Sequence, residues 1–136
     1  MPIHLERTDL LNTQQMEVAV NGPDGATHLI LCTGVANLGS VNHETFTFFV
    51  GPKFSRRQFV AAIASGALST VESYDENFSA HHNDNLRLGT NLVLIDANYD
   101  DESGQIIVRA EVSTGRAMTK LGISYNVSIL AELPNY

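Results

Sequence analysis

The alternation of side chains near the end of the chain restricts the possible folds more than any other feature. From Leu121 to Leu133, every odd-numbered residue is apolar, and the residues between them are small or polar except Leu130. Successive side chains of a β-strand point to opposite faces, so this pattern predicts a strand with one buried face. Thirteen residues of strand extend about 43 Å, whereas a domain of 136 residues is roughly 37 Å across. Such a strand must bend around a sandwich or barrel, or project and need a partner.

Other segments show a similar pattern. Residues 105–113 place every second side chain on one apolar face, and residues 86–99 carry leucines in phase. Shorter alternating or apolar segments span residues 16–20, 27–36, 46–50 and, with an uncertain register, 70–80. The sequence Asp100-Asp101-Glu102-Ser103-Gly104 predicts a hairpin loop between two of these strands. Short connections favour antiparallel neighbours, because parallel strands need a long crossover.

One segment has the local signals of a helix. Ser55 and Gln58 have the spacing of a capping box, and Phe54 and Phe59 have the spacing of a hydrophobic staple. Apolar residues then recur with helical spacing at Phe59, Ile63 and Ala67. The sequence therefore predicts an amphipathic helix over about 55–68.

The expected fold is a single β-rich domain spanning residues 1–136. It belongs to the mainly β (α+β) class, with about seven strands in an antiparallel sandwich or barrel-like meander. The amphipathic helix stands between the third and fourth strands. Strands of this length leave open edges or projecting hairpins, and both need partners. A homo-oligomer is therefore expected.

The net charge limits the kinds of partner. Fifteen Asp and Glu against eight Lys and Arg give a formal charge of −7, which argues against binding duplex nucleic acid through the overall field. No window approaches the ~20 apolar residues of a membrane span. The sequence Ser55-Arg56-Arg57-Gln58-Phe59 resembles a twin-arginine export signal, but its internal position makes it a decoy. We therefore expect a soluble, cytoplasmic protein.

The charges are unevenly distributed. The segment from Glu72 to Glu111 contains the whole acidic excess, whereas Lys53, Arg56 and Arg57 crowd into five positions. These three residues are a candidate contact for an anion or an acidic partner surface. The basic spot and the acidic segment could form opposite sides of one self-association interface.

Few residues suggest chemistry. Cys32 is the single cysteine, so an intrachain disulfide is impossible, and its apolar neighbours predict a buried side chain. His81 and His82, with Asp84 nearby, could contribute to a metal site or act as a general base, but their spacing matches no metal motif. A solvated polar loop is the simpler interpretation, and no cofactor or metal is expected.

A ligand cavity is the other possibility. Asp96 is in phase with the inward-facing leucines of its predicted strand, where a carboxylate must be paired or protonated. A bulge near Asp96 is the alternative explanation for this phase. Arg109 on the next strand faces outward by its own alternation, so it is not an expected partner of Asp96. Asp96, Tyr99 and Tyr125 are therefore candidate polar groups of a cavity.

The sequence favours a non-catalytic, self-assembling or partner-binding β-rich structural protein, such as a viral or phage-type assembly subunit. A small-molecule-binding β-barrel is the first alternative. A small hydrolase or lyase that uses His81 or His82 with a nearby carboxylate is the second. Whether the protein is an enzyme stays open, with the absence of a catalytic constellation favouring a non-enzymatic role.

Overall fold

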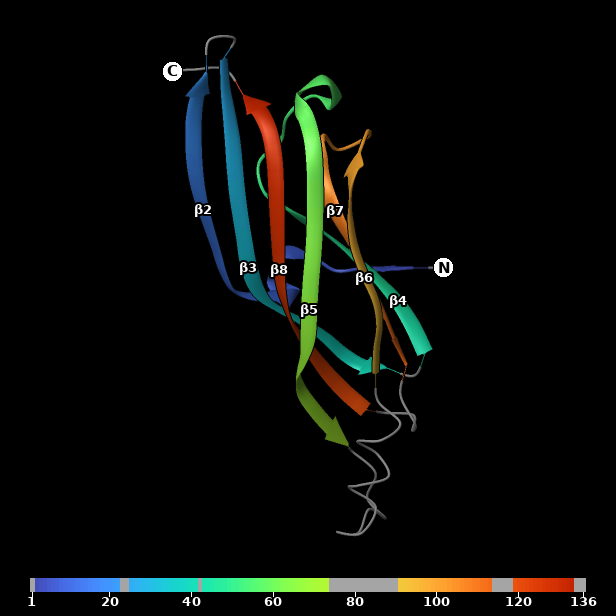
Figure 1. Cartoon of the computed structure of the whole chain (residues 1–136). Coiled ribbons are helices and arrows are strands. Elements are labelled where there is room, and N and C mark those ends of the chain that lie inside the picture. Colours follow the sequence, from blue (N-terminus) through green and yellow to red (C-terminus); the bar gives the residue numbers. More distant parts are fainter. Residues whose placement is uncertain (1, 23–24, 42, 74–90, 114–118, 134–136) are drawn as a thin grey trace.

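The chain folds into two four-stranded sheets that pack face to face (Figure 1). The computed structural model describes residues 2–22, 25–41, 43–73, 91–113 and 119–133. Sheet A has the order β1 (Ile3–His4), β4 (His43–Val50), β7 (Gln105–Ser113), β6 (Asn91–Asp100). Sheet B has the order β2 (Leu10–Gly22), β3 (Gly25–Val41), β8 (Thr119–Leu133), β5 (Phe59–Ser73).

The mainly β prediction is confirmed, and the described residues form a sandwich of two separate sheets rather than a closed barrel. All pairs of neighbouring strands are antiparallel except β1 and β4, which are parallel. The predicted meander is wrong, because only β2–β3 and β6–β7 are neighbours in both sequence and space. Elsewhere the chain crosses between the sheets, which lets the long strands β3 and β8 pair at the centre of sheet B.

The core lies between the sheets and follows the predicted alternation. In β8 the odd-numbered residues from Leu121 to Ala131 are buried, as the sequence predicts. They face the buried even-numbered residues of β7 and the buried aromatic side chains of Phe46 and Phe48 in β4. Burial of this apolar surface is the main favourable contribution to folding.

The helix predicted over about 55–68 is wrong, although its start signals are real. The backbone N–H of Ser55 donates to Gln58 Oε1 at 2.8 Å, and the rings of Phe54 and Phe59 stack with centroids 6.5 Å apart. They define a three-residue 3₁₀ turn, η2 (Arg56–Gln58), after which the chain continues as β5. No α-helix occurs among the described residues.

The reason lies in the spacing of the apolar residues. Phe59, Ile63 and Ala67 would share a face in a helix, but in β5 a bulge between Phe59 and Ala61 leaves Phe59 against the core and turns Ile63 and Ala67 outward. In β5 the inward face is formed by small and apolar residues that pack on the core, including Ala62, Ala64 and Leu68. Pairing with β8 along the whole strand then outweighs the helical preference of the alanines.

The predicted hairpin at Asp100–Gly104 is confirmed. Gly104 has a φ of +73°, and its backbone N–H donates to the Asp100 carbonyl oxygen at 2.9 Å. The side chain of Asp100 also accepts a hydrogen bond from the Ser103 N–H at 3.0 Å. Glycine supplies the left-handed backbone conformation that this turn requires.

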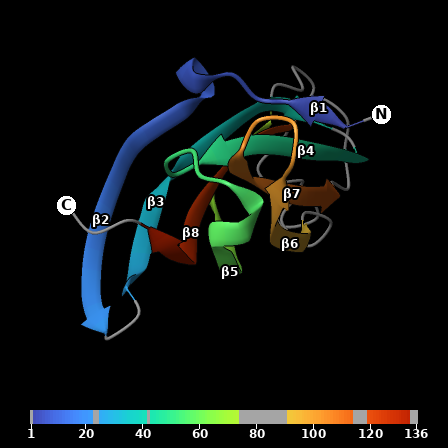
Figure 2. The same cartoon turned by 90° about the horizontal axis from the view of Figure 1, so that it is seen from above.

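Strand β2 forms one edge of sheet B and extends beyond the cover of sheet A. Figure 2 shows β2 standing apart from β4, β6 and β7, with β3 as its neighbour. Every residue of β2 after Leu10 is exposed. Within the described ranges, the structure contains no helix of the length and hydropathy that a membrane crossing requires.

Candidate functional site

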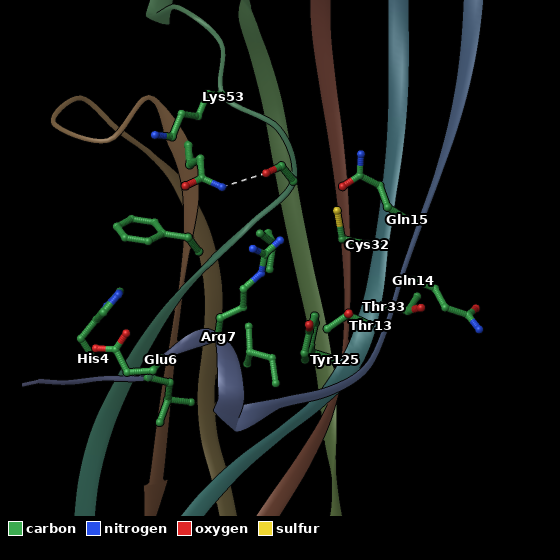
Figure 3. Close-up of a pocket in the computed structure, with 16 residues that line it drawn as sticks. His4, Glu6, Arg7, Thr13, Gln14, Gln15, Cys32, Thr33, Lys53 and Tyr125 are labelled. Atoms are coloured by element: carbon green, nitrogen blue, oxygen red, sulfur yellow. Dashed lines mark hydrogen bonds between the residues drawn. The ribbon is translucent and has the colours of Figure 1, made fainter.

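A cavity of about 600 Å³ opens between the two sheets on the side of β2. Its walls come from the N-terminal segment, from β2 and β3, and from the connection that follows β4 (Figure 3). We call it the β2 pocket. Its lining includes cationic, amide and apolar side chains.

The rim is built by a second 3₁₀ turn, η1 (Arg7–Asp9). Leu5 anchors this turn, because its side chain is buried and its N–H donates to the Thr47 carbonyl oxygen at 2.8 Å. The turn is closed by the N–H of Glu6, which donates to Asp9 Oδ2 at 2.9 Å. Figure 3 shows the Arg7 side chain extending from η1 into the space between the sheets.

The opposite side of the rim follows β4. Gly51 turns the chain with a φ of +76°, and Gln105 Nε2 donates to its carbonyl oxygen at 2.8 Å. Lys53 follows this turn and also lines the pocket. The pocket therefore receives one cationic side chain from the connection after β4 and one, Arg7, from η1.

One wall contains an irregularity of β2. The register between β2 and β3 shifts between Leu11 and Gln14, and Asn12 within this bulge has a φ of +53°. Bulges re-aim side chains and are frequent beside functional sites. Asparagine tolerates the left-handed conformation better than most residues. Thr13 and Gln15, on either side of Gln14, line the pocket.

The floor is formed by buried residues of β3 and β8. Tyr125 and Cys32 are almost fully buried, and the Tyr125 ring packs on Phe48 with centroids 4.9 Å apart. Burial raises the pKa of the Cys32 thiol to about 11. Burial, and secondly the neighbouring Cys32, also raises the pKa of Tyr125. Both groups are therefore protonated and uncharged at neutral pH, and the expected burial of Cys32 is confirmed.

The sequence-predicted site residues do not gather in one place. Lys53 and Tyr125 line the β2 pocket. Arg56 instead pairs with Asp101 at 3.2 Å, with both side chains largely exposed, and Arg57 is exposed. An exposed ion pair of this kind adds little stability. It does neutralise part of the basic spot within the same chain.

Tyr99 lies in an aromatic cluster near η2 rather than in the β2 pocket. Its hydroxyl donates to the Phe54 carbonyl oxygen, and its ring packs edge-on against Phe54 and Phe59. The Arg56 guanidinium carbon stands 5.7 Å from the centre of the same ring. These contacts join the β6–β7 hairpin to the start of β5.

The expected inward position of Asp96 is wrong. The register of β6 on β7 shifts between Leu92 and Leu94, which reverses the phase of the strand beyond that bulge. Asp96 consequently lies opposite Arg109 on the outer face of sheet A, and the two side chains pair at 2.9 Å. The bulge near Asp96 that the sequence allowed as an explanation is therefore present. Simple alternation placed Arg109 on the opposite face from Asp96, but the bulge brings the two side chains to the same face, where they pair.

His81 and His82 lie outside the described residues, as does their neighbour Asp84. Among the residues that the structure describes, no group of three or more His, Cys, Asp or Glu side chains could hold a metal ion. Arg7 was not singled out from the sequence. A signal was present, because Leu5-Glu6-Arg7-Thr8-Asp9 repeats the arrangement of Phe54-Ser55-Arg56-Arg57-Gln58, with an apolar anchor, a cap and a 3₁₀ turn.

The second notable surface is the outer face of sheet B. The pairing registers align three rows across its four strands: Gln14–Thr33–Asn126–Ser65, Met16–Leu31–Ser128–Ile63 and Val18–Leu29–Leu130–Ala61. We call the apolar residues of these rows, together with Val20, the apolar outer face. Met16, Val20 and Ile63 are 63%, 65% and 72% exposed. None of these row residues, all within the described ranges, carries a charge.

The outer face of sheet A has a different character. It carries the Asp96–Arg109 pair and a contact of 3.2 Å between His43 and Glu111. In β2 the charged residue, Glu17, turns to the opposite face from Met16 and Val18, where it pairs with the buried His28. The outer face of sheet A therefore carries charged pairs, whereas the charged residues that β8 places on the outer face of sheet B, Lys120 and Glu132, lie beyond the three rows.

Comparison with known proteins gave no relatives: no family model, curated protein or solved structure matches the chain.

Proposed function

We propose that the protein is a non-catalytic structural subunit that self-associates, and that a second copy covers the apolar outer face of sheet B. The observation that carries this proposal is the orientation of β2. Its alternating residues Met16, Val18 and Val20 have the pattern of a buried face, yet they point away from the core and are exposed. Large contiguous apolar surfaces of this kind mark interaction sites.

Charge favours a second copy of the chain as the occupant. Each copy has a formal charge of −7, so two copies repel each other over most approaches. The three aligned rows contain no charged side chain, although Glu132 lies beside them opposite Thr27, so these rows are where two identical copies meet with the least repulsion. A two-fold interface uses the same patch on both subunits, so the apolar face of one copy would pack on the apolar face of the other.

The size of the face is also appropriate. Four strands spaced by ~4.8 Å and a length of about 20 Å between the rows of Gln14 and Val20 make roughly 400 Å² of flat sheet. Protruding side chains increase the accessible area toward the ~800 Å² that each partner buries in a standard interface. Two such faces can stack as sheets do in a sandwich, at a separation of about 10 Å.

The edge formed by β2 supports the same conclusion. Soluble proteins protect long edge strands with lysine, proline or short length. The 13 residues of β2 include no lysine, arginine or proline, and the single charge, Glu17, is paired with His28. An unprotected edge strand of this kind is expected in a protein that functions as an oligomer.

Sedimentation equilibrium of the unmodified chain tests the proposal. We expect the average mass to rise with concentration from 14.8 kDa toward twice that value. Added salt should maintain or strengthen association, because it screens the repulsion between acidic copies and leaves apolar contacts intact. Loss of association in salt would favour the charge-complementary interface instead, and a constant monomer mass at high micromolar concentration would refute self-association.

A further inference from the structure

We infer that the β2 pocket binds a small organic acid, whose carboxylate is held at Arg7 and whose apolar body lies on the floor formed by Tyr125 and Cys32. This inference is independent of self-association, because the pocket and the apolar outer face are different surfaces. It rests on the charge of the rim, the chemistry of the floor and the size of the cavity.

The rim carries charge opposite to that of the whole protein. Arg7 and Lys53 contribute two positive charges from separate segments, and among the described lining residues Glu6 is the single carboxylate. Glu6 belongs to the capped turn that also presents Arg7. In a chain with a formal charge of −7, this local excess of positive charge attracts an anion to the cavity.

Arg7 is held ready for such a contact by the structure around it. Leu5 is buried on one side of η1, and the Glu6–Asp9 hydrogen bond closes the turn. The guanidinium group then extends into the cavity (Figure 3). Its planar fork of donors matches a carboxylate in a bidentate geometry, which gives both strength and orientation.

The floor selects for an apolar body on the ligand. Tyr125, Cys32 and Val50 are buried, and the raised pKa values keep the phenol and the thiol uncharged at neutral pH. A volume of about 600 Å³ is within the usual range of small-molecule sites and far larger than an inorganic ion needs. Inorganic phosphate would satisfy the rim but leave the floor uncovered.

Isothermal titration calorimetry with 3-phenylpropionate tests this inference. The matched uncharged probe is 3-phenylpropan-1-ol, and inorganic phosphate is the anion without an apolar body. We expect saturable binding of one 3-phenylpropionate per chain, and at least about tenfold weaker binding of the alcohol, because the alcohol lacks the charge-assisted hydrogen bonds. Phosphate should bind more weakly than 3-phenylpropionate. No saturable binding of the acid, or equal affinity for acid and alcohol, would overturn the inference.

A pair of variants locates the site. Arg7→Gln should weaken 3-phenylpropionate binding by at least about tenfold, whereas Arg57→Gln makes the same charge change at an exposed arginine outside the pocket lining and should leave it unchanged. Equal weakening by both variants would show attraction by net charge alone and refute the site. Because neither arginine is on the apolar outer face, the mass in sedimentation should stay that of the unmodified chain, which separates this test from that of self-association.

Discussion

Ile63→Lys is expected to keep the protein monomeric at concentrations where the unmodified chain associates. Ile63 is 72% exposed and lies in the middle row of the apolar outer face, on the edge strand β5, so the substitution costs the isolated chain little stability. In a face-to-face pair it would bury a lysine from each copy, and an unpaired buried charge costs several kcal/mol. Each 1.4 kcal/mol weakens association tenfold, so we expect the dissociation constant to rise by at least about a hundredfold in sedimentation equilibrium.

Leu94→Lys is the matched control for this variant. Leu94 is also an exposed apolar strand residue, at 39% exposure, but it lies on the outer face of sheet A opposite Glu111. The added charge is the same, so any effect of net charge on solubility or repulsion is shared by both variants. If Ile63→Lys associates as strongly as Leu94→Lys, the outer face of sheet B is not the interface.

Gly34→Ala is expected to destabilise the fold by about 1–3 kcal/mol, as overpacking does in a close-packed interior. A Cβ at position 34 would stand 2.5 Å from the Tyr125 hydroxyl oxygen and 2.8 Å from Cζ of the same ring. Tyr125 is wedged between Gly34 and Phe48, so it cannot move aside without disturbing the core. Urea unfolding followed by far-UV circular dichroism measures the change as a lower midpoint with an unchanged slope.

Gly22→Ala provides the comparison for the glycine substitution. A Cβ at position 22 meets its nearest neighbour, the Gly25 carbonyl oxygen, at an ordinary 3.5 Å. Both substitutions reduce the freedom of the unfolded chain equally, so the difference between them isolates the clash with Tyr125. Equal midpoints for the two variants would mean that Tyr125 does not occupy the space beside Gly34.

The sequence predicted the strands well where one face is buried and the other is not. In β8 the odd-numbered residues alternate with small or polar ones, and burial follows that alternation. The prediction failed in β5, because the spacing of Phe59 and Ile63 indicates a helix, whereas in the strand a bulge after Phe59 places these two residues on opposite faces. Local capping at Ser55 and Gln58 could not decide between them, since it describes how a turn begins and not how the chain continues.

The candidate site was less predictable, because it depends on register shifts and on which strands meet in space. One bulge in β6 reversed the face of Asp96, and a second bulge in β2 shapes the pocket wall. Neither is marked by a glycine or proline in the sequence. Tyr125 was found because its strand has an unambiguous phase, and Lys53 because it belongs to a visible charge cluster. Arg7 is far from that charge cluster in the sequence, and only the fold brings it to the same pocket as Lys53.

The exposed pattern of β2 was also ambiguous in the sequence. Alternation identifies a strand with one apolar face, but it does not say whether that face meets the chain's own core or another molecule. In β2 the polar residues Gln15 and Glu17 share the face of the buried β3 residues, and the apolar residues point outward. This inversion became visible only through the pairing register with β3.

The rate of Met16 oxidation in the unmodified protein tests the central claim most directly. Met16 is 63% exposed in the single chain and belongs to the apolar outer face, so a second copy on that face would shield its thioether sulfur. Dilute hydrogen peroxide converts an accessible methionine to its sulfoxide, and peptide mass spectrometry follows that product at Met16. We predict that the oxidation rate falls severalfold as the protein concentration is raised through the range in which the mass doubles. An unchanged rate across that range would contradict the claim, because it would leave the outer face of sheet B open in the assembled protein.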